Sequence, residues 1–209
     1  MATMDPGATT IKPLTLDTWD LFAALVDRHN GIFGGCWCMH FHPSCAHQDG
    51  ASPGGRTLKR RMVSSGVAHA ALVVRDGDDG EEAIAWAEYG TPSELPNLHH
   101  RKQYLADLAL AAESEPDYRV TCIFVDRRFC RQGLVEVALQ GALNLIAQAG
   151  GGVVEGYPHL PPEKKTSSSF LYNGTSTVYE RAGFGLVRAK GLRNTVMRRV
   201  VEATSANAT

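Results

Sequence analysis

VDRRFCRQGLV, residues 125–135, joins two segments of different pattern. The residues that end at its first position, 118–125, form a short apolar run rich in β-formers and predict a buried strand. The residues after the stretch, 134–148, repeat apolar side chains at helical spacing, and three glycines at 150–152 end that helix. A buried strand that runs directly into a helix indicates an α/β domain.

The turn between this strand and this helix suits a phosphate group. A helix N-terminus offers unpaired N–H groups and a partial positive charge. Gly133 lets a phosphate approach the backbone closely, and Arg127, Arg128 and Arg131 add positive charge around it. The alternative is an ordinary turn, but together these features predict a pyrophosphate site.

The rest of the chain predicts a mixed sheet. In order, the expected elements are helices over 14–28 and 57–66, strands over 68–75, 82–90 and 118–125, a helix over 134–148, a strand over 153–158, a short helix over 174–184, and strands over 184–189 and 194–201. Residues 91–117 form a long polar excursion with one helical patch, 104–112. Excursions of this length often serve as lids or binding loops.

Length, charge and cysteine content indicate the class of protein. The 209 residues suit one domain, predicted over 12–201 with flexible tails at 1–11 and 202–209. A net charge of −1 lacks the positive excess that would indicate binding to nucleic acid or to an anionic membrane surface. We therefore expect neither as a partner. No apolar run reaches the roughly 18 residues that span a bilayer. Five cysteines without a secretory signal predict reduced thiols and a cytoplasmic location.

Two motifs resemble the GCN5-related N-acetyltransferase (GNAT) superfamily. Residues 125–135 are similar to its acetyl-CoA-binding motif, with Gly133 at the central glycine and with Cys130 and Val135 departing from the usual residues. STVYERAGF, 176–184, is similar to a second signature, with Tyr179 at its tyrosine. The chain also resembles an uncharacterised subgroup with an N-terminal Cys-Trp-Cys segment. The resemblance implies an α/β fold whose mixed, mostly antiparallel sheet of about six to seven strands is flanked by helices.

This resemblance implies transfer of an acetyl group from acetyl-CoA to the primary amine of a small molecule, by direct attack in a ternary complex. Pantetheine would insert between the strands over 118–125 and 153–158 and pair with the backbone of Phe124 and Val125. The pyrophosphate would meet the N–H groups of Arg131, Gln132, Gly133, Leu134 and Val135. One strand N–H would polarise the thioester carbonyl, and Tyr179 would protonate the leaving thiolate.

The amine must lose a proton before it attacks, so a base is needed. The candidates are Glu155, Glu88 and His159. Glu155 lies in an apolar run, where burial would raise the pKa of its carboxyl group toward a useful value. Its alternative is a carboxylate on a solvated strand face or one bonded to a backbone N–H.

Residues 34–48, GGCWCMHFHPSCAHQ, concentrate possible metal ligands. Four of them alternate along the chain: Cys36, Cys38, His40 and His42. An extended segment would point all four to one face but spread them over about 20 Å, too far for one zinc ion unless Cys45 and His47 fold back. We therefore expect no metal, and a loop that lines the acceptor pocket with Trp37, Cys38 and His40.

Two other functions stay open from the sequence: a non-catalytic acyl-CoA-binding sensor on the same fold, and a zinc-binding module that uses residues 36–47. The expected partner is the small-molecule amine, and a homodimer is possible.

Overall fold

A computed structural model describes residues 5, 7–32, 34–43, 54–161 and 172–204 of the chain. At its centre is a seven-stranded sheet with strand order β1-β2-β3-β4-β5-β7-β6. Its strands are β1 Thr9–Pro13, β2 His69–Gly77, β3 Gly80–Gly90, β4 Tyr118–Val125, β5 Gly152–Gly156, β6 Gly185–Lys190 and β7 Asn194–Val201. Neighbours are antiparallel except for β4 and β5, which are parallel. The expected mixed, mostly antiparallel sheet is confirmed.

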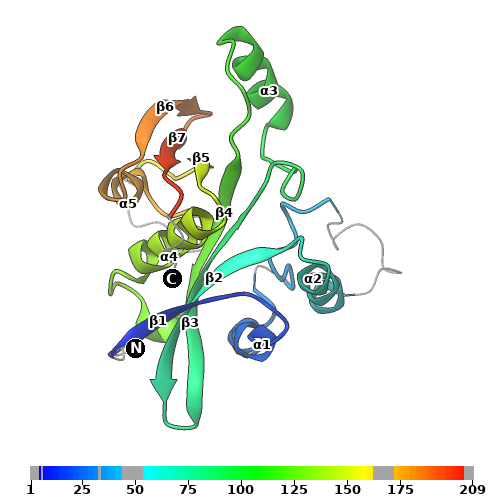
Figure 1. Cartoon of the computed structure of the whole chain (residues 1–209), viewed down its shortest axis with the longest axis vertical. Helices are drawn as coiled ribbons and strands as arrows, with labels where there is room; N and C mark the ends of the chain where they lie inside the picture. The colour runs from blue at the N-terminus through cyan, green and yellow to red at the C-terminus, as the bar shows by residue number, and fades with distance from the viewer. Residues whose placement is uncertain (1–4, 6, 33, 44–53, 162–171, 205–209) are drawn as a thin grey trace.

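Helices cover both faces of the sheet. They are α1 Trp19–Arg28, α2 Gly55–Ser64, α3 Arg101–Leu110, α4 Leu134–Gln148 and α5 Ser176–Arg181, with a short 3-10 helix, η1, at Arg127–Phe129. Helices α1 and α2 lie on one face and α4 on the other, while α3 stands at the end of the sheet (Figure 1). Among the described residues, no helix is both long and apolar enough to cross a membrane.

Each face has its own apolar core. Phe22 of α1 packs edge-on against Trp86 of β3, with ring centroids 5.0 Å apart. On the opposite face, α4 buries Ala138, Leu139 and Ala142, as its helical spacing predicts. A Cβ on Gly141 would lie 2.9 Å from the Ile11 side chain, so this glycine lets α4 approach β1 closely.

Three elements differ from the expectation. Strand β1 begins at Thr9, inside the predicted tail of residues 1–11, and pairs with β2 through Ile11 and Val73. Its five residues are too few to show a strand pattern without the partner strand. Helix α3 runs over 101–110 instead of the predicted 104–112. Helix α1 begins at Trp19, five residues after its predicted start at 14. The remaining elements lie within about three residues of their predicted bounds.

Strand β4 continues beyond the end of β5. The two strands pair only from Tyr118↔Val154 to Val120↔Gly156, although β4 continues to Val125. At this point β4 carries a bulge: Glu88 of β3 pairs with Cys122 while Tyr89 pairs with Val120, which leaves Thr121 as the extra residue. A bulge increases the local twist and bends the strand. We call residues 121–125, which have no partner in β5, the strand divergence.

Candidate functional site

Helix α4 begins just after the strand divergence, and its first backbone N–H groups have no partner among the described residues. Its N-cap, Gly133, has φ 77° and lacks a side-chain cap. Within the described part of the chain, no group accepts a hydrogen bond from the N–H of Gly133, Leu134 or Val135. Arg131, also left-handed at φ 64°, is exposed next to them. This arrangement can bind an anion such as a diphosphate.

One of the three arginines of this turn points elsewhere. Arg128 donates from Nη2 to Glu82 Oε2 at 2.7 Å and to Asp126 Oδ2 at 2.9 Å. Arg127 and Arg131 are exposed. The expectation that all three arginines surround the phosphate is therefore wrong for Arg128, because two carboxylates hold its guanidinium group.

The backbone of β4 alternates between its two edges. The N–H of Asp126 donates to Ile84 O of β3 at 2.8 Å, so the N–H of Phe124, two residues back, also faces β3. The N–H of Ile123 faces the other edge, where it donates to Tyr172 O at 2.6 Å. Ile123 and Val125, and not Phe124 as expected, therefore present their backbone to the strand divergence.

The segment 172–174 lies in the strand divergence. Besides the bond between Ile123 and Tyr172, Gly174 O accepts from His159 N, and Asn173 Nδ2 donates to Tyr157 O at 3.2 Å. A carbonyl group of the protein thus holds the N–H that faces this edge of β4.

Tyr179 of α5 is buried beside this segment. A Cβ on Gly156 would overlap its ring, and one on Gly174 would lie 3.8 Å from its Cε2. Its hydroxyl group is buried and has no hydrogen-bond partner among the described residues. Burial, with a smaller effect of the Cys122 thiol, raises the pKa of Tyr179. The phenol therefore stays protonated at neutral pH and can donate a proton.

Glu88 forms a buried ion pair. Its Oε1 lies 2.6 Å from Lys59 Nζ and 3.3 Å from His42 Nε2, and its Oε2 accepts from the bulge residue, Thr121, at 2.8 Å. Burial alone would raise the pKa of Glu88, but Lys59 and His42 outweigh it and lower the pKa to about 2. So acidic a carboxyl group is a poor proton acceptor, and the structure argues against Glu88 as the base.

Glu155 is held in a second buried network. Its Oε2 accepts from Arg198 Nε at 2.6 Å, and it lies opposite Arg119, where β4 and β5 are still paired. Val154 packs in the same core as Tyr179, so Glu155 faces the other side of the sheet. Tyr179 therefore lies at the strand divergence, as predicted from the sequence. Glu155 instead binds Arg198, and it lies one residue before the last paired residue of β5, Gly156.

The Cys-Trp-Cys segment packs onto α1 and β4. Trp37 and Cys38 have φ of 50° and 53°, and both are buried. Trp37 stacks on Trp19 at 6.1 Å, so it serves the core instead of an open pocket, which corrects its expected role. Cys38 Sγ lies 3.1 Å from Cys122 Sγ, directly beside the strand divergence.

Histidines from distant segments meet near Tyr172. His40 stacks on His99 with ring centroids 4.8 Å apart, and His99 and His159 each contact the Tyr172 ring, at 6.2 and 5.7 Å. The Nε2 of His159 is buried and has no partner among the described residues, and burial lowers the pKa of this imidazole. His99 was not singled out from the sequence; the only signal for it was its place in the long excursion.

Metal binding finds no support in the part of the chain that the structure describes. There, no group of three or more His, Cys, Asp or Glu side chains is arranged to hold a metal ion. Cys45 and His47, the ligands that a folded-back zinc site would need, lie outside the described residues.

The fold is shared with solved structures of N-acetyltransferases. It matches the mosquito arylalkylamine N-acetyltransferase like 5b over 92% of this chain and 100% of that chain, with a TM-score of 0.53 and 12% identity. It matches the ribosomal-protein-S5-alanine acetyltransferase from Vibrio fischeri over 96% and 97%, with a TM-score of 0.50 and 10% identity. No family model and no curated protein matches the sequence. At identities this low, the structural match establishes a shared fold and nothing more.

Proposed function

We propose that this chain transfers an acetyl group from acetyl-CoA to the primary amine of a small molecule. The observation that carries the proposal is the strand divergence itself. The N–H groups that open α4 follow its far end, and Tyr179 lies beside it; among the described residues, neither these N–H groups nor the Tyr179 hydroxyl group has a hydrogen-bond partner. The two matched structures, both of acetyltransferases, support the same reaction class.

The residues present fit acetyl-CoA as a substrate. The N–H groups of Gly133, Leu134 and Val135 would bind the diphosphate, with Arg131 and Gln132 beside them. The backbone of Ile123 and Val125 would pair with pantetheine. Ile123 N–H, which now donates to Tyr172 O, would instead donate to the thioester oxygen. Such a donor typically contributes about 2.7–4 kcal/mol to lowering the barrier.

Two proton transfers accompany the bond changes. The amine nitrogen attacks the thioester carbon and the carbon–sulfur bond breaks. His159 Nε2 takes the amine proton, since its imidazole is neutral and its Nε2 has no partner among the described residues. Tyr179 gives its phenolic proton to the leaving sulfur. We assign the base to His159 and not to Glu155, because His159 lies against Tyr172 in the strand divergence. Glu155 lies where β4 and β5 are still paired, and Arg198 holds its Oε2, although its Oε1 has no partner among the described residues.

A thiol-release screen of amines against acetyl-CoA tests this function, together with calorimetric titration of CoA. In the Tyr179→Phe variant we expect CoA affinity within about threefold of wild type and turnover reduced by roughly 10²–10⁴-fold. His159→Asn should lower turnover similarly, whereas His100→Asn, an exposed neighbour in the excursion, should not. Unchanged turnover removes the altered residue from its role, and a wild type that gives no heat with CoA refutes the function.

The ion pairs of Glu88 and Glu155 favour one alternative function, a non-catalytic acyl-CoA-binding protein. Glu88 is too acidic to take a proton from an amine, and Arg198 holds one oxygen of Glu155 where β4 and β5 are still paired. Heat with CoA but no thiol release with any amine in the screen would select this alternative.

A further inference from the structure

A network of charged side chains anchors the turn between β4 and α4. At its centre is Asp126, whose carboxylate is fully buried. Asp126 Oδ1 accepts from the backbone N–H of Arg128 at 2.9 Å and so caps η1. Asp126 Oδ2 accepts from Arg28 Nη1 at 2.7 Å and from Arg128 Nη2 at 2.9 Å. One carboxylate therefore joins the turn to the end of α1.

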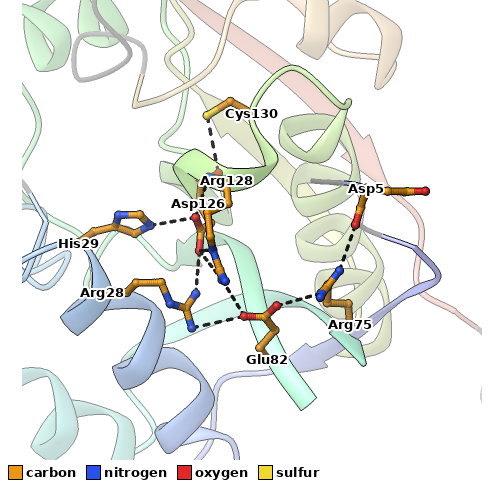
Figure 2. Close-up of polar contacts among 8 residues, drawn as sticks. All are labelled: Asp5, Arg28, His29, Arg75, Glu82, Asp126, Arg128 and Cys130. Atoms are coloured by element: carbon orange, nitrogen blue, oxygen red, sulfur yellow. Dashed lines mark hydrogen bonds and ion pairs between the residues drawn. The ribbon is translucent and has the colours of Figure 1, made fainter. Parts of the chain in front are cut away.

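A second carboxylate closes the network. Glu82 of β3 lies 2.7 Å from Arg128 Nη2 and 3.5 Å from Arg28 Nη2, and it also accepts from Arg75 at 2.9 Å. Arg28 and Arg128 thus each contact both Asp126 and Glu82, as Figure 2 shows. Three separate elements, α1, β3 and the turn, are held together by four side chains.

The ionisation of Asp126 follows from its partners. Burial alone would raise the pKa of Asp126, but its hydrogen bonds with Arg128 and Arg28 outweigh burial and lower the pKa. His29 Nε2 lies 3.4 Å from Asp126 Oδ1, yet burial lowers the pKa of His29. The imidazole is therefore mostly neutral at pH 7, and the two arginines balance the charge of Asp126.

The turn that Asp126 holds has an unfavourable backbone. Arg131 and Gly133 are both left-handed, and the donors that open α4 have no acceptor among the described residues. The turn also concentrates three arginines near the positive end of a helix. Asp126 offsets this repulsion and turns Arg128 away from the helix end, which leaves the N–H groups of α4 open to an anion.

We infer that Asp126 is a positioning residue of the cofactor site: it orients the turn 127–135 for the diphosphate of coenzyme A without touching the cofactor. The inference rests on the proposed function, since it presumes that coenzyme A binds there. It predicts that the charge of Asp126, and not the network in general, sets the affinity for the diphosphate. Phosphate sites are sensitive to displacements of a few tenths of an ångström in their donors.

The test is calorimetric titration of the full chain with CoA. For Asp126→Asn, which keeps the size of the side chain but removes its charge, we expect binding weakened about tenfold or more. Glu82→Gln is the matched control, because it lies in the same network but does not cap η1; its affinity should stay within about threefold. The donor S-acetylpantetheine, which lacks the diphosphate, should bind Asp126→Asn within about twofold of wild type.

The outcomes separate this inference from the function beneath it. If wild type binds CoA and Asp126→Asn binds it equally well, or if Glu82→Gln loses as much, only the inference falls. If wild type gives no heat with CoA, the function falls and takes the inference with it. Should Asp126→Asn not fold, Asp126→Ser, which also removes the charge but keeps a hydroxyl group that can cap η1, must still weaken CoA about tenfold or more; wild-type affinity in that variant overturns the inference.

Discussion

Single residues set the chemistry of the strand divergence. Tyr179 reaches it only because β5 ends in glycine: a side chain at Gly156 would occupy the space of the Tyr179 ring. The same ring lies beside Gly174 on its other edge. The tyrosine is visible in the sequence, but its dependence on these glycines is not, since they lie more than twenty positions and about five positions away along the chain.

Replacing Gly156 by alanine should displace Tyr179. We expect a loss of about 1–3 kcal/mol in unfolding free energy, as for other overpacked sites, and a fall in turnover like that of Tyr179→Phe. Gly54→Ala is the control, because a Cβ there meets nothing within 4 Å. Urea unfolding and thiol release measure the two effects, and normal turnover in Gly156→Ala would show that Tyr179 does not need this space.

At the scale of elements, two local irregularities build the site. The bulge at Thr121 lies where the pairing of β4 with β5 stops, and the left-handed Gly133 opens α4 after the end of β4. Hydrogen bonds hold the bulge in place: Thr121 donates to Glu88, and Glu88 in turn accepts from Lys59 of α2. The position of the strand divergence therefore depends on α2 as well as on β4.

Gly133→Ala should reduce CoA affinity beyond its effect on stability. An alanine at φ 77° costs roughly 1–2 kcal/mol and shifts the backbone donors of α4. Gly191→Ala is a matched control, since Gly191 has φ 67°, also has nothing within 4 Å of an added Cβ, and lies in the turn between β6 and β7. We expect similar losses of stability in both variants, but a loss of CoA affinity of about tenfold only in Gly133→Ala. Equal affinities by calorimetry would contradict the role of the helix donors.

Across the whole molecule, ion pairs with a buried carboxylate connect different elements. Lys59 and Glu88 join α2 to β3, Arg28 and Asp126 join α1 to the end of β4, and Arg198 and Glu155 join β7 to β5. Lys59–Glu88 is buried on both sides, and removing one partner of a pair of this kind leaves an uncompensated buried charge and typically costs about 3–5 kcal/mol. These pairs make the stability of the fold depend on pH.

The Lys59–Glu88 pair should contribute to acid unfolding. The pKa of Glu88 is about 2 in the folded protein and near 4.5 when unfolded, so its stabilisation is present above pH 4.5 and is lost as pH falls toward 2. This amounts to about 3 kcal/mol. The double variant Lys59→Met/Glu88→Gln should therefore lose less stability than wild type between pH 7 and pH 3, as urea unfolding would measure. Equal losses in both proteins would contradict this assignment.

The pattern of the sequence by itself determined the elements and the order of most of them. Apolar periodicity marks α1, β3, β4 and α4, and the glycine between β4 and α4 marks the candidate phosphate turn, because these signals lie within neighbouring residues. Tyr179 was predicted from the resemblance of residues 176–184 to a family signature.

Only the tertiary structure decided which charges are available for chemistry. From the sequence, Arg128 was expected to bind the phosphate and Glu88 was a candidate base for the amine. In the structure, Glu82 of β3 holds Arg128, and Lys59 of α2 holds Glu88. Strand β1 was missed for the same reason, since its strand character comes from pairing with β2. A side chain's charge and a strand's hydrogen bonds depend on neighbours in space, and the chain brings those neighbours together only when it folds.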